Sequence, residues 1–302
     1  MKRRGWGLWV IEGKSSPLEG EATRAAARAG EGDKRDGFPL HSSPRSALLS
    51  RPLPQGERDT LSLVSDTPDL DLKILREHAR DDSELASFIA RRLNHEPVAY
   101  ITGTRGFWTI DLDVSPAVLI PRPDSEALID AAVAHFGNDG PKRILDLGTG
   151  SGALLLAALD QWSDATGVGV DASEAALAIA RQNADRITPG RADMRLGNWT
   201  NGIDEMFDLV LCNPPYVETG ATLDPQVRDY EPASALFAGP DGLDDYRILA
   251  PQLTRVISGI ACIEIGHTQA AAVTTLLKNE GFAVVCYKDL GGRDRCLVAK
   301  RK

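Results

Sequence analysis

The chain has 302 residues, a hydrophobic fraction of 42% and a charged fraction of 25%, which fit one large α/β domain with a smaller appendage. The net charge of −9 argues against a protein that grips nucleic acid chiefly through phosphates, because such binding needs clustered Lys and Arg. From this charge we expect no direct nucleic-acid binding. No stretch approaches the roughly 18 apolar residues that span a membrane, so we expect no membrane partner either.

Two small units are predicted before the main domain. Residues 1–65 are rich in Gly, Pro, Arg, Ser and Glu and hold no apolar period beyond one turn, which predicts a disordered or atypical extension. A helical rhythm follows and predicts a small helical unit over residues 66–105, whose second helix Asp82-Ser83 would cap. Alternating apolar residues then predict a β-hairpin within 106–120, which links this unit to the main domain.

Beyond Pro141 the chain alternates strand and helix in the manner of a parallel sheet. The predicted strands are apolar runs at Arg143–Leu147, Thr166–Val170, Phe207–Cys212, Gly259–Ile265, Phe282–Tyr287 and Arg295–Ala299. A short Gly-rich connection joins the last two strands, and a hairpin there would make the final strand antiparallel to its neighbours. The expected fold is therefore α/β, with a Rossmann-like, mostly parallel sheet in residues 106–302.

The first of these strands runs into a glycine-rich turn formed by Gly148, Thr149, Gly150, Ser151 and Gly152. Glycine lets a backbone turn tightly and approach a ligand closely, here beside the N-terminus of an apolar helix. The spacing also fits the dinucleotide-binding fingerprint, so the turn is compatible with nicotinamide as well as with S-adenosylmethionine. This motif alone leaves the cofactor open.

An acidic residue, Asp171, ends the next apolar strand about 20 residues downstream, where a carboxylate can hold both ribose hydroxyls of either cofactor. The alternative role is to cap the following helix, and Ser173 can serve that role instead. The glycine turn and Asp171 together predict a nucleoside-binding α/β fold.

Asn213, Pro214, Pro215 and Tyr216 follow the strand at Phe207–Cys212, and so lie at the edge of the sheet where ligands bind. Two prolines stiffen the loop and remove two backbone donors, which leaves carbonyl groups as acceptors. The Asn213 side chain adds an acceptor, and Tyr216 offers a flat face. Such a site suits a planar group whose NH2 is held through both hydrogens, and it favours a methyl donor over nicotinamide.

This four-residue string, placed after an S-adenosylmethionine-type glycine turn, resembles that of the amino-methyltransferases. Six further strings resemble the HemK/PrmC family, the peptide chain release factor glutamine methyltransferases. They are Glu96–Gly103, Val118–Glu126, Asp146–Gly152, Glu231–Ala235, Asp241–Leu243 and Glu264–Gly266. The resemblance covers roughly residues 85–302. It implies a class I methyltransferase sheet, S-adenosylmethionine as cofactor, and the glutamine of a release factor's Gly-Gly-Gln motif as substrate.

The resemblance also implies which residues bind the cofactor. The turn from Gly148 to Gly152 would line its methionine and adenosine side, and Asp171 would hold its ribose. Trp199 would form an apolar wall along the adenine. Asn213 would contact both the cofactor and the substrate.

The substrate and catalytic residues are implied in the same way. Asn213 and the carbonyl of Pro214 would accept the two amide hydrogens of the glutamine. Tyr216 would pack against the plane of that amide, and Pro215 would complete the substrate site. Asn213, Pro214 and Tyr216 are therefore the predicted catalytic residues.

Two departures from the family pattern stand out. The family string Pro-Arg-Pro-Glu-Thr-Glu has Asp124 and Ser125 here, which keeps an acid and a hydroxyl. Residues 1–65 do not resemble the family's N-terminal helical domain, which is implicated in docking the release factor, so we expect that domain to be shortened or partly replaced.

Several other functions stay open. The chain could methylate a ribosomal-protein glutamine or an exocyclic amine of nucleic acid, although residues 66–302 are acidic. It could also be a catalytically silent cofactor-binding protein or, if the Asn-Pro-Pro-Tyr loop is accidental, a nicotinamide oxidoreductase. The five His residues have no ligand-like spacing, so no metal is expected. The scattered cysteines suit reduced thiols in the cytoplasm, and we expect a monomer.

Overall fold

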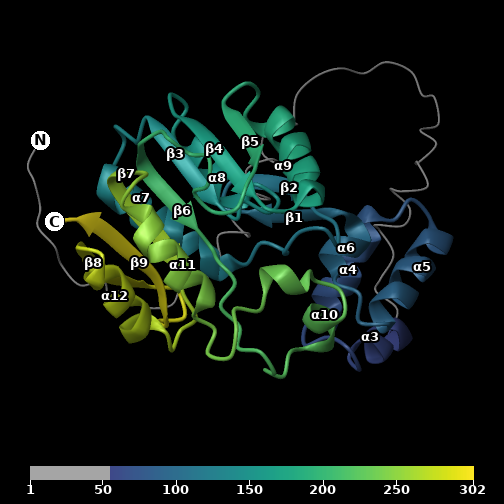
Figure 1. Ribbon diagram of the computed structural model, residues 1–302. Helices are drawn as coiled ribbons and strands as arrows, with labels where there is room; N and C mark the ends of the chain where they lie inside the picture. Colours follow the sequence, from purple (N-terminus) through teal and green to yellow (C-terminus); the bar gives the residue numbers. More distant parts are fainter. Residues whose placement is uncertain (1–54) are drawn as a thin grey trace, which may run out of the picture. The chain divides into compact units, whose positions relative to one another are not determined.

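The computed structural model describes residues 55–302 (Figure 1). Most of the extension expected at 1–65 therefore lies outside the described residues. Helix α3 (Gln55–Leu61) lies inside that segment, and it buries Leu61 completely in the core of the helical unit. The sequence did not predict this helix, because one buried apolar residue makes no detectable repeat. The helical unit thus begins upstream of residue 66.

Within the described residues, three further helices belong to the N-terminal helical unit, namely α4 (Pro68–His78), α5 (Asp82–Leu93) and α6 (Val98–Thr102). The N-cap of α5 is Asp81, not the predicted Asp82-Ser83 pair. Its Oδ1 accepts a hydrogen bond of 2.9 Å from the N–H of Glu84. The expected helical character of this region is confirmed, with the cap one residue earlier.

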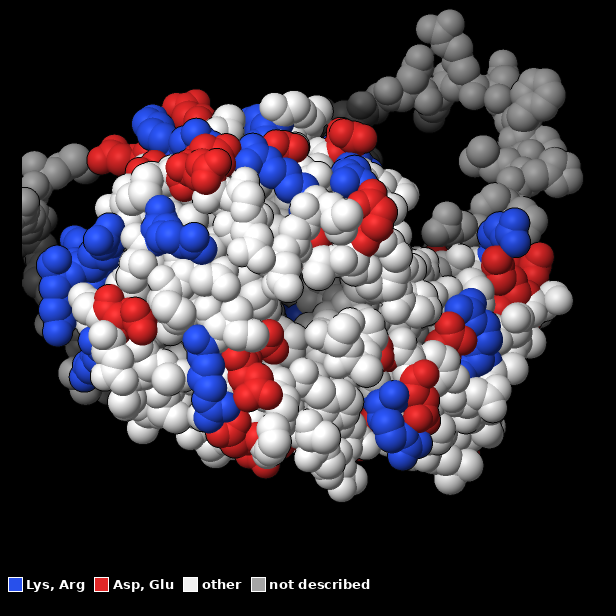
Figure 2. Space-filling view, in the orientation of Figure 1, with Lys and Arg blue, Asp and Glu red and all other residues white. Residues whose placement is uncertain are grey.

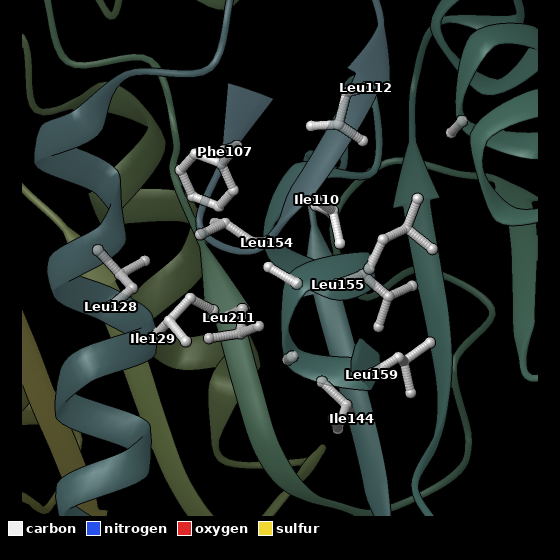
Figure 3. Close-up of a cluster of buried hydrophobic side chains, with 14 of the residues drawn as sticks. Phe107, Ile110, Leu112, Leu128, Ile129, Ile144, Leu154, Leu155, Leu159 and Leu211 are labelled. Atoms are coloured by element: carbon white, nitrogen blue, oxygen red, sulfur yellow. The ribbon is translucent and has the colours of Figure 1, made fainter. Parts of the chain in front are cut away.

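The hairpin predicted within 106–120 is formed by β1 (Thr104–Phe107) and β2 (Ile110–Asp113), which pair antiparallel. One face of the hairpin is buried, and Phe107 and Leu112 extend from it into the main hydrophobic core (Figure 3). A short turn of 3₁₀ helix, η2 (Pro123–Ser125), then leads into α7 (Glu126–Phe136). The hairpin thereby carries the chain from the helical unit to the sheet.

The main domain is built on a seven-stranded sheet within the described residues. Its strands are β3 (Arg143–Leu147), β4 (Thr166–Asp171), β5 (Ala192–Leu196), β6 (Phe207–Cys212), β7 (Ile257–Glu264), β8 (Phe282–Lys288) and β9 (Asp294–Arg301). They lie in the order β5-β4-β3-β6-β7-β9-β8 (Figure 1). The pairs from β5 to β7 are parallel, and β9 runs antiparallel to both of its neighbours. The predicted Rossmann-like sheet with an antiparallel last strand is confirmed.

Helices cover both faces of this sheet. One face is covered by α7, α8 (Ala153–Gln161) and α9 (Glu174–Ile187), and the other by α11 (Asp244–Leu253) and α12 (Ala270–Asn279). Successive strand residues alternate between the two cores: Ile144 packs in the first and Leu145 in the second. Burial on both sides explains why these strands are almost continuously apolar in the sequence. Each fully buried aliphatic side chain contributes about 1.5–3 kcal/mol to folding.

The strand order places a topological switch at β3. The chain leaves β3 toward β4 and β5 on one side and later returns to β6 on the other. In open α/β sheets a crevice forms outside the carboxyl ends of the strands at such a point. Within residues 55–302 no helix has both the length and the apolar character needed to cross a membrane.

Candidate active site at the carboxyl edge of the sheet

A cavity of about 610 Å³ lies at the carboxyl ends of β3, β4 and β6. Its volume falls within the range of roughly 300–1,000 Å³ that small-molecule sites occupy. Figure 2 shows a hollow in this face of the molecule, bordered mainly by uncharged residues. The cavity wall contains segments of the glycine turn, the ends of β4 and β6, the η2 region and the loop before α11.

The glycine turn forms the floor of the cavity. Gly148, Thr149, Gly150 and Ser151 line it, whereas Gly152 does not. The N–H groups of Gly148 and Thr149 both donate to the same carbonyl at the end of β4, at 2.9 and 3.0 Å. Gly152 has φ of +86°, and a Cβ there would lie 2.9 Å from a side-chain carbon of the following helix. The last glycine therefore serves the turn and its packing, and the first four residues face the cavity.

Asp171 lies at the carboxyl end of β4 and lines the cavity. Its Oδ2 accepts from the N–H of Gly150 and its Oδ1 from the N–H of Ser173, both at 2.9 Å. Ser173 is the N-cap of α9, with its hydroxyl accepting from the N–H of Ala176, as the sequence led us to expect. Each carboxylate oxygen still has a lone pair for a ligand. Asp171 is thus held in place by the backbone, with acceptor capacity left at the cavity.

Trp199 forms an apolar wall on the same side of the cavity. A Cβ placed on Gly148 would meet the Trp199 ring at 3.5 Å, so the indole lies directly over the start of the glycine turn. The half-exposed side chain of Ile248, on α11, extends this apolar surface. The wall suits a flat aromatic group.

The Asn-Pro-Pro-Tyr loop divides between the cavity and the core. Asn213 and Pro215 line the cavity, whereas Pro214 is buried and Tyr216 packs against the second core. The Asn213 Nδ2 donates to the Ser125 Oγ at 3.3 Å. The loop therefore delivers the Asn213 amide to the same cavity as the glycine turn. Packing of Tyr216 on a substrate stays a prediction.

Tyr216 is fixed at both ends. Its hydroxyl lies 3.4 Å from Oε1 of Glu264, and burial raises the pKa of this phenol. Its carbonyl accepts from the Nε2 of Gln269 at 3.1 Å. The same Nε2 donates to the carbonyl of Gly242, at 3.1 Å, so one glutamine ties the loop to the segment before α11.

Glu264 is a residue for which sequence reasoning gave no role beyond the family string. It ends β7, next to β6, and only 1% of it is exposed. Burial raises the pKa of its carboxyl group to about 7, although the nearby Ser125 hydroxyl and the charge of Arg295 act in the opposite direction. A carboxylate at the end of an apolar strand was the signal that could have revealed it.

A second set of residues outside the sequence prediction connects two cavity walls. Glu231 is buried and bonds the Arg122 guanidinium and the N–H of Ile120, the latter at 3.2 Å. Two tyrosine hydroxyls then connect these walls to the N-terminal helical unit. Tyr100 donates to the carbonyl of Val118, and Tyr230 to the carbonyl of Asn94, both at 2.6 Å. The family strings at 118–126 and 231–235 therefore build one continuous wall.

Two other carboxylates support the sheet. Asp146 lies beneath the glycine turn, where Thr149 Oγ1 donates to it at 2.6 Å and burial raises its pKa to about 7. Asp208 accepts from the N–H groups of Lys142 and Arg143, at 2.9 and 3.0 Å, which places it at the amino end of β3. Asp208 therefore supports the backbone where β3 begins. Among the described residues, no group of three or more His, Cys, Asp or Glu is arranged to hold a metal.

The chain is similar to known methyltransferases. Residues 138–289 match a family model described as a methyltransferase domain. A release factor glutamine methyltransferase from Caulobacter vibrioides is 43% identical over 227 residues, covering 73% of this chain and 78% of the relative. Another, from Rhodospirillum rubrum, is 37% identical over 297 residues, covering 90% and 91%. The solved hMettl16 catalytic domain, bound to the MAT2A 3'UTR hairpin 6, shares the fold with a TM-score of 0.52 and 13% identity, over 75% of this chain and 81% of that one.

Proposed function

This chain belongs to the release factor glutamine methyltransferase family, and from that premise we propose how its cavity works. It transfers a methyl group from S-adenosylmethionine to the side-chain amide nitrogen of the glutamine in the Gly-Gly-Gln motif of a peptide chain release factor. One observation supports this assignment above the others. Asn213, the proposed amide acceptor, lines the same cavity as Asp171 and the turn at 148–151.

The cavity residues fit the proposed cofactor. Asp171 would accept hydrogen bonds from the ribose hydroxyls, and the Trp199 ring would cover the adenine. The absence of a side chain at Gly148 leaves room beneath Trp199, where a Cβ would stand 3.5 Å from the ring. When bound, S-adenosylmethionine supplies a methyl group on a positively charged sulfur.

The Asn-Pro-Pro-Tyr loop would hold the substrate amide. An amide nitrogen is a poor nucleophile, because its lone pair is delocalised into the carbonyl. Acceptors from Asn213 Oδ1 and the Pro214 carbonyl would grip its two hydrogens from one side and favour the state in which the lone pair turns toward the methyl group. They also stabilise the positive charge that develops on nitrogen during transfer. Tyr216 would complete the site by packing on the amide plane.

Geometry contributes the rest of the rate enhancement. The two prolines stiffen the loop, and Gln269 fixes the carbonyl of Tyr216. A rigid site that aligns the nucleophile with its methyl donor can lower the barrier by about 7–11 kcal/mol at best. After methyl transfer, the proton would leave the methylated nitrogen to water.

The test is direct methylation. Purified protein is incubated with isotopically labelled S-adenosylmethionine and a purified release factor, or with ribosomes, and the label is located by mass spectrometry. We expect it on the glutamine of the Gly-Gly-Gln motif. Label on a ribosomal protein or on RNA would show that this molecule, and not a release factor, is the substrate. Because release factors act in the cytoplasm, we also propose that the protein works there, as a monomer.

A further inference from the structure

We propose that Ser125 and Glu264 are positioning residues that hold the Asn213 amide with its oxygen turned toward the substrate. The proposal rests on the proposed function, because it specifies how the acceptor of the substrate amide is oriented. Neither residue would touch the reacting atoms. Both act through Asn213.

We call the series Asn213, Ser125 and Glu264 the relay, and three separate segments meet in it. Asn213 follows β6, Ser125 ends η2, and Glu264 ends β7. Asn213 Nδ2 lies 3.3 Å from the Ser125 Oγ. The Ser125 hydroxyl in turn lies close enough to the Glu264 carboxylate to counteract the rise in its pKa. Ser125 is 4% exposed and Glu264 is 1% exposed. The Glu264 Oε2 is buried and has no hydrogen-bond partner among the described residues, so it is free to accept the proton of Ser125.

The direction of the relay follows from its donors and acceptors. An ionised Glu264 can only accept hydrogen bonds, so the single proton of Ser125 goes to it. The remaining lone pairs of the Ser125 Oγ can then only accept, and of the two ends of the Asn213 amide only the NH2 can donate. The amide oxygen is left facing the cavity that Asn213 lines.

This orientation matters because the substrate amide also presents an NH2. An Asn213 turned the other way would point its own NH2 at the substrate donors, and the two groups would repel each other. A free asparagine side chain can adopt either orientation, since its oxygen and nitrogen are almost equal in size. The relay selects the orientation in which Asn213 accepts.

Glu264 has several charged or titratable neighbours. The Tyr216 hydroxyl approaches its Oε1 at 3.4 Å, and the Tyr246 hydroxyl donates to its backbone carbonyl at 2.8 Å. Arg295, which pairs with Asp124 at 3.0 Å and Asp289 at 3.3 Å, supplies positive charge. The thiols of Cys212 and Cys296 are also near enough to interact with it.

A protonated Glu264 would reverse the relay. Its new O–H would donate to Ser125, and the Ser125 proton would be free to meet the Asn213 oxygen. Burial raises the pKa of Glu264 to about 7. We therefore expect kcat to fall as the pH drops through about 7, with a smaller change in KM. The ionised form, which predominates above this pH, is the active one.

The first experiment compares matched side chains at Ser125. Ser125→Thr keeps the hydroxyl, and Ser125→Val has the same shape without it. With the full chain, S-adenosylmethionine and release factor, we expect Ser125→Val to lower kcat about 10- to 100-fold, the usual effect of losing an orienting partner. Ser125→Thr should restore most of that loss. Cofactor affinity, measured by calorimetry, should stay the same in both variants. Equal kcat values for Thr and Val would overturn the proposal.

The second experiment measures pH profiles. Glu264→Gln removes the titrating group. Its kcat at about pH 8 should be lower than that of the wild type. Its pH profile should also lack the acid limb, which is the fall in kcat as the pH drops through about 7. Asp208→Asn, at the opposite end of the sheet, also removes a carboxylate and should keep that limb. An unchanged limb in Glu264→Gln would refute the role of this residue. If the wild-type protein does not methylate release factor at all, the proposed function fails instead, which separates the two results.

Discussion

Replacing Asn213 by alanine is the sharpest test of the proposed chemistry. The substitution removes the Oδ1 that would accept one substrate hydrogen, together with the Nδ2 that donates to Ser125 at 3.3 Å. Asn213 is only half-buried, and the lost neutral hydrogen bond is worth about 1 kcal/mol, so folding should survive. The Asp171 carboxylate and the glycine turn stay intact, and cofactor affinity should change little.

The expected kinetic effect is much larger than the effect on folding. Removing one preorganised polar group that acts on the transition state typically costs about 3 kcal/mol. At 1.36 kcal/mol for each factor of ten, this corresponds to a fall in kcat of about 150-fold. Both kcat and kcat/KM should fall together, because the interaction strengthens in the transition state.

The assay is single-turnover methylation of release factor with labelled cofactor, alongside calorimetric measurement of cofactor binding. Asn279→Ala, at the exposed end of α12, is the matched control and should behave as wild type. Methylation by Asn213→Ala at the wild-type rate would show that the loop does not grip the substrate amide. Loss of cofactor binding would show that Asn213 serves the cofactor instead.

Three further predictions concern the cofactor, the sheet and the loop. Asp171→Asn should weaken S-adenosylmethionine binding about tenfold or more in calorimetry, because hydrogen bonds to a charged group are worth about 1.5–3 kcal/mol. Burial raises the folded-state pKa of Asp146 to about 7, whereas an unfolded Asp titrates near about 3.9, so wild-type stability should fall as pH rises between these values. The gain in Tm of Asp146→Asn over wild type should accordingly be larger at about pH 8 than at about pH 5, and an equal difference at both would contradict this. Gly242 and Gly202 both have positive φ, but only at Gly242 would a Cβ collide with the backbone carbonyl of Tyr216. Denaturant unfolding should therefore show a loss of about 1–2 kcal/mol for Gly202→Ala and a clearly larger loss for Gly242→Ala, and the latter should also lower activity.

The sequence alone predicted most of the sheet and both cavity-lining motifs, whereas the edge strand β5, which buries only Met194, was not among the predicted apolar runs. The strands are continuous apolar runs because helices bury both of their faces, and such runs are visible without knowledge of the fold. The turn at 148–152 needs left-handed backbone at three positions, and all three are glycine, the residue that adopts this conformation most readily. The local sequence therefore reveals the turn. Asp171 and Asn213 lie at the ends of predicted strands. Because the carboxyl ends of parallel strands share one edge of the sheet, the sequence indicated that the two residues lie near each other.

Only the tertiary structure decided how those residues are supported. Ser125 and Glu264 lie far from Asn213 in the sequence, and it is the packing of η2 and β7 beside β6 that brings them into contact. The same is true of the Arg122–Glu231 pair and of the insertion of β9 between β7 and β8. Helix α3 was also not predicted, because Leu61 is recognised as a core residue only once the neighbouring helices are packed around it. Propensity and periodicity act over a few residues, whereas a hydrogen bond between distant segments depends on where the whole chain has packed them.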